Sequence, residues 1–284
     1  MTIGIGVLCS SKPKPHVPRP DSIVMISDTM GSTDTDSTDD LHKMFIEEDV
    51  RLYAVCANRM EKCADLWPGI CREFRGLPIR THGAFQETLN RVVLGHRAQH
   101  FQFDILGPRH TIVPGQMPTM QHEAVMAEFQ AYDSGAEMLI GTFDLNGQAL
   151  LYHIGPLPNS FGFVHLCEFP GYMAIGAGAY NAITWLNHRR QVLGKSTRQS
   201  AYHAYEGKKM AERTPSVNDD IEMVIATPDG SFQLMRDQEV IVRGQESAER
   251  CPVSLAELEV LHEKYQAPKT DDLGHPKPSV SSRK

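Results

Sequence analysis

Short apolar runs, rich in β-branched residues and bounded by turn residues, recur near the start, in the centre and towards the end of the chain. Runs of about four to eight such residues are typical of buried strands. We therefore expect strands at residues 2–8, 22–27, 43–46, 51–57, 136–144, 148–154, 163–168, 172–175, 221–227 and 231–236.

Helical spacing of apolar residues separates these groups of strands and predicts helices at residues 60–74, 83–100, 123–132, 179–193, 199–213 and 254–265. Pro68 lies inside the first of them and is expected to kink or split it, because proline has no N–H to donate. Gly194 is a normal stop after the fourth. Ser254 and Glu257 have the spacing of a capping box at the start of the last helix.

Glycine, proline and polar residues mark the connections. Residues 12–20 hold four prolines, which predict an exposed insertion between the first two strands. The tripeptide Leu145-Asn146-Gly147 is a hairpin turn signal. After Gln266 apolar residues are almost absent. We therefore expect one folded domain at residues 1–265 and a disordered tail at residues 266–284.

The order of these elements predicts the architecture. Groups of hairpin-linked strands alternate with pairs of helices, whereas a parallel sheet needs single helices between successive strands. Hairpin connections imply antiparallel sheets, and helices in pairs imply outer layers. The expected fold class is therefore α+β, as a four-layer α-β-β-α sandwich of two antiparallel sheets flanked by helix pairs.

The composition is that of a soluble globular protein, with 41% hydrophobic and 22% charged residues in a chain of 284. The net charge of -7 argues against a nucleic-acid partner. The densest basic points, at residues 188–190 and 208–209, are short and are expected on the solvent side of helices. No run reaches the roughly 20 apolar residues of a membrane helix, and the start lacks the charged leading region of a signal peptide. We expect a cytoplasmic protein.

The six cysteines do not change this interpretation. No two of them have CxxC spacing, so neither a zinc ribbon nor a thioredoxin-type site is indicated. Buried reduced thiols are the simpler expectation.

Thr2 is the first candidate for chemistry. It directly follows Met1, and a small second residue favours removal of the initiator methionine. Thr2 would then carry a hydroxyl and a free α-amine on one residue. The reference pKa of that amine is about 7.7–8.0, so a useful fraction is an uncharged base near neutral pH. An amine on the same residue is a recognised means of activating a threonine nucleophile.

Several segments resemble one family, the proteasome β-type subunits with their bacterial relatives, the ClpQ-type peptidase and the Anbu-type proteasome homologues. The resemblance extends from about Thr2 to Arg236. The segments that carry it are Thr-Ile-Gly-Ile-Gly-Val at 2–7, Ser-Asp-Thr at 27–29, Lys43, the strand-turn-helix element at 53–66, Leu-Ile-Gly-Thr-Phe-Asp at 139–144 and Ala-Ile-Gly-Ala-Gly-Ala at 174–179.

The resemblance implies an N-terminal nucleophile (Ntn) hydrolase that acts as a threonine peptidase. Thr2 would attack the peptide carbonyl and its amine would accept the proton. Lys43 would place a positive charge near the hydroxyl, and Asp28 would orient Lys43. A backbone N–H at Asn58 would stabilise the oxyanion. No metal or organic cofactor is needed for this chemistry.

The same resemblance implies peptide or unfolded-protein substrates and a homo-oligomeric ring or stacked assembly. The resemblance leaves open whether an ATPase partner exists. Asn58 stands where the family usually has Gly, and Ala177 where a serine hydroxyl usually supports the amine. The nearest match to a late Asp-x-x-Ser element is Ser216. Two alternatives therefore remain, a catalytically inactive assembly subunit of the same fold and an amidohydrolase acting on small-molecule amides.

Other signals are weaker. The stretch from Gly176 to Asn181 approaches a dinucleotide fingerprint, but no βαβ unit surrounds it, and its glycines are better explained by close strand-helix packing. His96 and His100 have helical spacing without a third metal ligand and are expected to be exposed. The acidic residues at 34–40 lack the glycine and closing glutamate of a calcium loop. We therefore expect no metal site.

Overall fold

The structure is a computed structural model, and it describes residues 3–11, 19–29, 31–32, 37–38, 43–78, 80–106, 119–155, 164–236, 239–243 and 253–266. Thr2, most of the proline-rich insertion at 12–20, most of the acidic loop at 34–40 and the tail after Gln266 lie outside these residues.

Two antiparallel sheets form the body of the protein. The larger, six-stranded sheet consists of β10 (Tyr172–Gly176), β1 (Ile3–Cys9), β2 (Ser22–Ser27), β11 (Glu222–Ala226), β12 (Phe232–Arg236) and β13 (Glu239–Arg243), in that order. The five-stranded sheet consists of β5 (Met44–Glu47), β6 (Leu52–Asn58), β7 (Ala136–Phe143), β8 (Ala149–Ile154) and β9 (Val164–Leu166). A separate two-stranded ladder joins β3 (Gly31–Ser32) to β4 (Ser37–Thr38), and a 3-10 turn, η1 (Glu48–Val50), joins β5 to β6.

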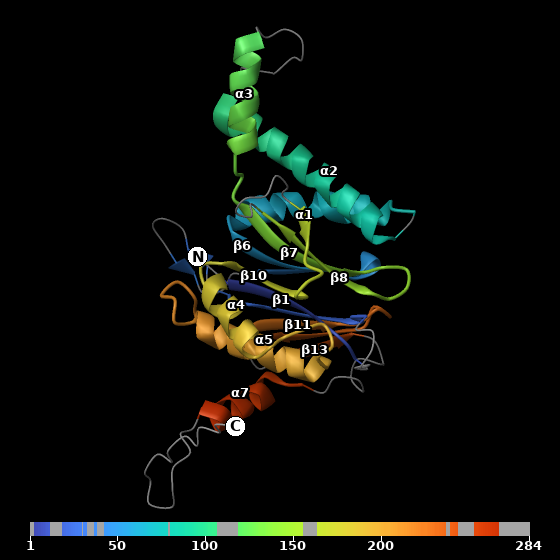
Figure 1. Cartoon of the computed structure of the whole chain (residues 1–284), viewed down its shortest axis with the longest axis vertical. Coiled ribbons are helices and arrows are strands. Elements are labelled where there is room, and N and C mark those ends of the chain that lie inside the picture. Colours follow the sequence, from blue (N-terminus) through green and yellow to red (C-terminus); the bar gives the residue numbers. More distant parts are fainter. Residues whose placement is uncertain are drawn as a thin grey trace, which may run out of the picture.

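The two sheets face each other and are covered by helices on their outer sides (Figure 1). Between them lies an apolar cluster to which both contribute, for example Met25 and Val224 from one sheet and Val55 and Leu139 from the other. The predicted α+β class with two antiparallel sheets is thus confirmed. Because the strands of these sheets are buried on both faces, their sequences are continuous apolar runs.

Glycines in β1 allow the sheets to approach closely. The outward side chains of β1, such as Ile3 and Ile5, pack into the cluster under the helices. Gly4 and Gly6 face the opposite sheet, where a Cβ on Gly6 would lie 2.8 Å from Cδ1 of Leu151. The alternating isoleucines and glycines of β1 therefore reflect its two faces. The isoleucines fill the space under the helices, and the glycines leave room for the opposite sheet.

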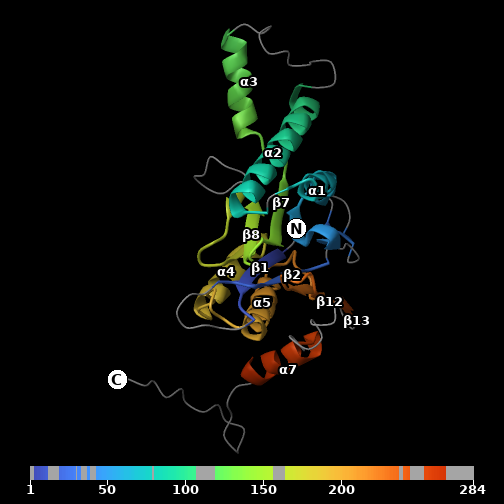
Figure 2. The ribbon, with the colours of Figure 1, turned by 90° about the vertical axis from the view of Figure 1, so that its right-hand side faces the viewer.

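The five-stranded sheet is covered by α1 (Met60–Arg75) and α2 (His82–Phe101), which is followed by a π-helical turn, η2 (Gln102–Leu106). α2 runs obliquely away from the layers, and α3 (Thr119–Ala131) stands at its far end (Figure 2). The expectation that Pro68 could split the first helix is wrong, because α1 continues through it. Pro68 is exposed, so the carbonyl that loses its donor, that of Ala64, lies on the solvent side of the helix.

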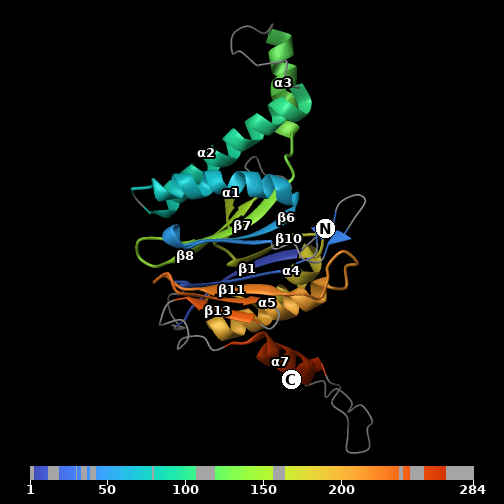
Figure 3. The same cartoon turned by 180° about the vertical axis from the view of Figure 1, so that it is seen from behind.

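The six-stranded sheet is covered by α4 (Ala179–His188) and α5 (Thr197–Ala211), and α7 (Leu255–Gln266) lies beyond α5, as the reverse view also shows (Figure 3). α4 ends well before Gly194, contrary to prediction. Arg190 has a φ of 52°, and the N–H groups of Arg190 and Gln191 donate to the carbonyls of Asn187 and Leu186. This is a Schellman ending that uses arginine in place of glycine, so no sequence signal marked it.

The capping box predicted for the last helix is present. Ser254 Oγ accepts the N–H of Glu257 at 3.2 Å, and Glu257 Oε2 accepts the N–H of Ser254 at 3.4 Å. Strand β13 was missed by the sequence analysis, although its sequence, Glu-Val-Ile-Val-Arg, has a β-branched centre. The cysteines within the described residues are free thiols, buried at positions 9, 56, 63 and 71 and half-buried at 167.

Tyr53 lies fully buried between the sheets and provides a test of this core. Its ring makes edge contacts with Phe143 of its own sheet and Phe232 of the opposite sheet, at centroid distances of 6.4 and 5.9 Å. Its hydroxyl has no hydrogen-bond partner within the described residues. Since a buried, unsatisfied hydroxyl is costly, Tyr53→Phe should raise the free energy of unfolding by about 1 kcal/mol, whereas Tyr53→Ala should lower it by about 4 kcal/mol. Urea denaturation measures both, and a loss of stability in Tyr53→Phe would contradict this account.

Candidate functional site

Asp28 and Lys43 form a buried ion pair where the two sheets meet at one end. Asp28 directly follows β2 of the six-stranded sheet, and Lys43 directly precedes β5 of the five-stranded sheet. The Nζ of Lys43 lies 2.8 Å from Oδ1 of Asp28, and the two side chains are 1% and 0% exposed. Two of the four predicted site residues are thus in direct contact, although 15 positions separate them in the chain.

The start of the chain is attached to the same pair. Oδ1 of Asp28 also accepts the backbone N–H of Ile3 at 3.1 Å, and the N–H of Asp28 donates to the carbonyl of Ile3 at 3.4 Å. One carboxylate oxygen therefore connects the first described residue to the ammonium of Lys43. Thr2, the predicted nucleophile, is bonded to Ile3 but lies outside the described residues.

Glu222 is a second carboxylate at this site, and the sequence analysis missed it. It is the first residue of β11 and is fully buried. Its Oε2 accepts the backbone N–H of Lys43 at 3.3 Å, and its Oε1 lies 2.6 Å from Nε of Arg236. The sequence did contain a signal for Glu222, because it is a single charge at the edge of an otherwise apolar strand. A buried charge of this kind requires a partner.

The electrostatics of Lys43 combine two opposing effects. Burial lowers the pKa of Lys43, because the charged form loses water. The negative charges of Asp28 and Glu222 raise the pKa and oppose that shift. The arrangement holds a positive charge in a position shielded from solvent, where its field is stronger than at the surface.

Asn58, the predicted oxyanion donor, ends β6 close to this pair. The carbonyl of Lys43 accepts the N–H of Cys56 at 3.0 Å, and Asn58 follows two residues later, about 7 Å along the strand. Asn58 is exposed, has a φ of 61°, and donates from Nδ2 to Glu137 Oε2 at 2.7 Å. Asparagine accepts this left-handed conformation more readily than most residues other than glycine.

A polar network borders the ion pair on the side of the six-stranded sheet. Thr29 Oγ1 donates to Asp220 Oδ2 at 3.0 Å, and Asn218 Nδ2 contacts the same Asp220 oxygen at 2.9 Å and Thr29 Oγ1 at 3.2 Å. Ser216, the predicted candidate in this region, does not belong to this network of Thr29, Asn218 and Asp220. The segment that reaches the site is thus 218–220, just beyond Ser216.

Lys208 of α5 contacts that segment. The expectation that Lys208 lies on a solvent face is wrong. Its side chain is 0% exposed, and Nζ donates to the carbonyl of Asn218 at 2.6 Å and to Glu212 Oε1 at 2.7 Å. Burial lowers its pKa, which the negative charges of Glu212 and Asp28 oppose. Helix periodicity reveals the pairing with Glu212 but not the burial, because the second partner, Asn218, comes from the connection after α5.

Gly178, just before α4, is a position of close packing, but its neighbour is the end of a second helix and not a strand as predicted. A Cβ on Gly178 would lie 2.7 Å from Cβ of Ala211, at the end of α5. Ala177, which stands where the family usually has serine, is exposed. The antiparallel pairing of β10 with β1 also confirms that no dinucleotide-binding βαβ unit surrounds this stretch.

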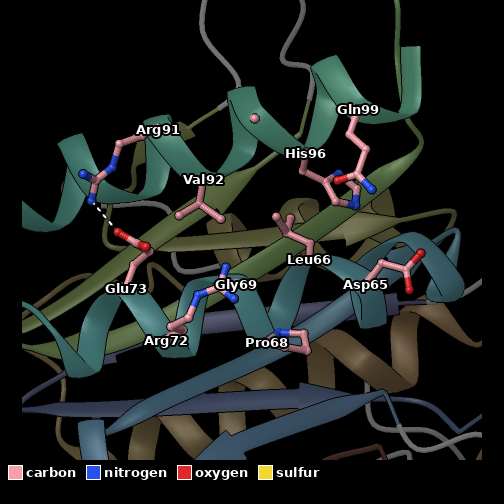
Figure 4. Close-up of a pocket in the computed structure, with 11 residues that line it drawn as sticks. Asp65, Leu66, Pro68, Gly69, Arg72, Glu73, Arg91, Val92, His96 and Gln99 are labelled. Atoms are coloured by element: carbon pink, nitrogen blue, oxygen red, sulfur yellow. Dashed lines mark hydrogen bonds and ion pairs between the residues drawn. The ribbon is translucent and has the colours of Figure 1, made fainter. Parts of the chain in front are cut away.

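A groove with a volume of about 580 Å³ lies elsewhere, between α1 and α2 on the outer face of the five-stranded sheet (Figure 4). Its rim carries the ion pair between Arg91 and Glu73, with Nη2 2.6 Å from Oε2. This groove is remote from Asp28 and Lys43, which lie on the opposite side of that sheet. It therefore adds nothing to the chemistry of the ion pair.

His96 lies at one end of this groove, and both His96 and His100 are half-buried, contrary to the expectation that they are exposed. Their ring centroids are 4.2 Å apart, and Nδ1 of His100 lies 2.8 Å from Nζ of Lys62. Burial, followed by the charge of His100, lowers the pKa of His96 to about 4. Within the described residues, no group of three or more His, Cys, Asp or Glu side chains is arranged to hold a metal ion.

Comparison with protein-family models gives no match, and no curated protein sequence matches the chain. None of the helices in the described part of the chain is long and apolar enough to span a membrane.

Proposed function

We propose that this protein is a proteasome-like Ntn hydrolase that cleaves peptide bonds with Thr2 as its nucleophile. The observation that carries the proposal is the position of Oδ1 of Asp28, which contacts both Nζ of Lys43 and the N–H of the residue after Thr2. The two stacked antiparallel sheets with helices on both outer faces are compatible with this fold class.

Covalent geometry limits how far Thr2 can lie from the ion pair. Standard bond lengths keep the Cα of Thr2 within about 2.5 Å of the nitrogen of Ile3. That nitrogen is 3.1 Å from Oδ1 of Asp28. Bond lengths of this size are compatible with the proposed approach of the hydroxyl and α-amine of Thr2 to the ion pair, within about 8 Å of this carboxylate oxygen.

The proposed reaction gives each of these groups a role. The Thr2 hydroxyl oxygen attacks the substrate carbonyl carbon, and its proton passes to the free α-amine, directly or through water. Lys43 stabilises the negative charge that develops on the threonine oxygen, and Asp28 holds Lys43 in place. The N–H of Asn58 donates to the oxyanion. The α-ammonium then protonates the leaving amine as the C–N bond breaks, and water hydrolyses the threonine ester.

The left-handed backbone at Asn58 supports its part in this scheme. The family pattern has glycine at this position, and Asn58 has a positive φ of 61°, the conformation for which glycine is most often chosen. We expect peptide or unfolded-protein substrates, a homo-oligomeric ring or stacked assembly in the cytoplasm, and no cofactor. A partner ATPase would be needed only for folded substrates.

Covalent labelling tests the proposal. A peptide epoxyketone requires a hydroxyl and a free amine on the same residue, so the expected result is one adduct per chain on Thr2, detected by intact mass and peptide mapping. The unlabelled mass should correspond to a chain without Met1. Retention of Met1 together with the absence of an adduct would indicate a non-catalytic assembly subunit. An adduct without peptide hydrolysis would favour a small-molecule amidohydrolase.

A further inference from the structure

Strand β13 forms one edge of the six-stranded sheet. It pairs antiparallel with β12, and no other described strand lies on its outer side. An edge strand presents backbone N–H and C=O groups that are available for pairing with another chain. Natural proteins usually protect such edges with proline, a bulge or a central charged residue. The sequence of β13, Glu-Val-Ile-Val-Arg, has none of these at its centre.

The side chains at the centre of β13 are apolar and exposed. Val240, Ile241 and Val242 are 47%, 38% and 41% exposed, whereas their partners on β12 are almost fully buried, at 0% for Met235 and 6% for Leu234. Burial therefore ends abruptly at the outermost strand of the sheet. Three consecutive β-branched residues on an open edge favour addition of a further strand.

The sequence of β13 identifies the strand that fits there. In an antiparallel pair of two identical strands centred on Ile241, position 239 lies opposite position 243, and Val240 lies opposite Val242. Each end of the pair then brings a glutamate opposite an arginine, and opposite charges facing each other across strands are stabilising. A parallel in-register pair would place glutamate opposite glutamate, and a shift by one position would remove the charge pairing.

We propose that β13 is a self-association edge, at which β13 of one copy pairs antiparallel with β13 of a second copy. The pair joins the six-stranded sheets of both copies into one continuous sheet with a two-fold axis at Ile241. Each residue contact is made twice in such an isologous interface. A five-residue strand buries less than the roughly 1,200 Å² of a stable interface, so the expected dissociation constant is micromolar.

Charge reversal tests the proposed register in the full chain. Glu239→Arg places arginine opposite arginine at both ends of the pair, and Arg243→Glu places glutamate opposite glutamate. Each single variant should weaken self-association at least tenfold in sedimentation velocity over roughly 1–200 µM, because like charges directly opposite each other destabilise the pair. An equimolar mixture of the two variants should associate as the wild type does, because every end then carries opposite charges.

Glu263→Arg is the matched control, because it makes the same charge change at an exposed position of α7. It should leave self-association unchanged. Thermal unfolding of each chain checks that the fold is retained. The inference is overturned if the wild type shows no concentration-dependent association, if both β13 variants associate like the wild type, or if their mixture fails to recover association. Association through other surfaces would be unaffected by the β13 variants. Recovery of association in the mixture therefore distinguishes pairing through β13 from association through other surfaces.

Discussion

Peptide hydrolysis by the Thr2→Ala variant is expected to fall by about a thousandfold or more. The substitution removes the hydroxyl that forms the covalent ester, while the α-amine, Lys43 and Asp28 remain. Loss of the nucleophile in a covalent mechanism leaves only the residual effect of substrate binding and the oxyanion donor. Steady-state hydrolysis of a panel of fluorogenic peptides, corrected for the mass-verified removal of Met1, measures the effect.

Thr2→Ser is the control, because serine retains both a hydroxyl and an α-amine on residue 2. It should keep measurable hydrolysis and react with the epoxyketone. If Thr2→Ala cleaves the peptides as fast as the wild type, the activity belongs to another site and the proposed mechanism is wrong.

The second large effect concerns stability. Asp28→Ala should lower the free energy of unfolding by about 3–5 kcal/mol, because it leaves the ammonium of Lys43 buried without its nearest partner. It also removes the acceptor of the Ile3 N–H. The double variant Asp28→Ala/Lys43→Met should lose less than the sum of the two single variants, since no uncompensated charge then remains at this position. Urea denaturation of the four chains gives the coupling free energy.

The Asp28→Ala variant should also show a defined pH dependence. Burial already lowers the pKa of Lys43, and Asp28 is the main opposing influence. Without Asp28 the folded-state pKa falls further below the unfolded value of about 10.4. The unfolded chain then binds more protons between these two values, so the free energy of unfolding rises as the pH increases towards 10. The stability deficit relative to the wild type should shrink between pH 7 and pH 9.5, and a constant deficit would argue against a buried charged lysine.

Most of the strands and helices could be predicted from local patterns. The turn at Leu145-Asn146-Gly147 is an example, since Asp144 Oδ1 accepts the N–H groups of Asn146 and Gln148, and Gly147 has a φ of 73°. The end of α4 could not be predicted, because Arg190 takes the left-handed conformation usually given to glycine. The packing around the helix decided that ending.

The residues of the candidate site likewise include some that could be predicted from the sequence and some that could not. Thr2 was predicted from its position after Met1, and Asp28 and Lys43 were predicted from the resemblance to one family. Lys208 was missed, because a charged side chain in a helix looks the same in the sequence whether water or another charge surrounds it. Glu222 was missed although it stands beside an apolar run, because its partners are not identified by that run. Their burial depends on partners such as Arg236 and Asn218, whose contacts arise only when the sheet and α5 are assembled.

The sequence by itself determined most of the strands and their antiparallel arrangement, because runs of apolar residues and their turns report burial and chain reversal locally. Only the tertiary structure decided which charges meet at the end of the sheets and which of the described strands is outermost. Both depend on the loss of water from groups that lie far apart in the chain, and that loss leaves no periodic pattern in the residues themselves.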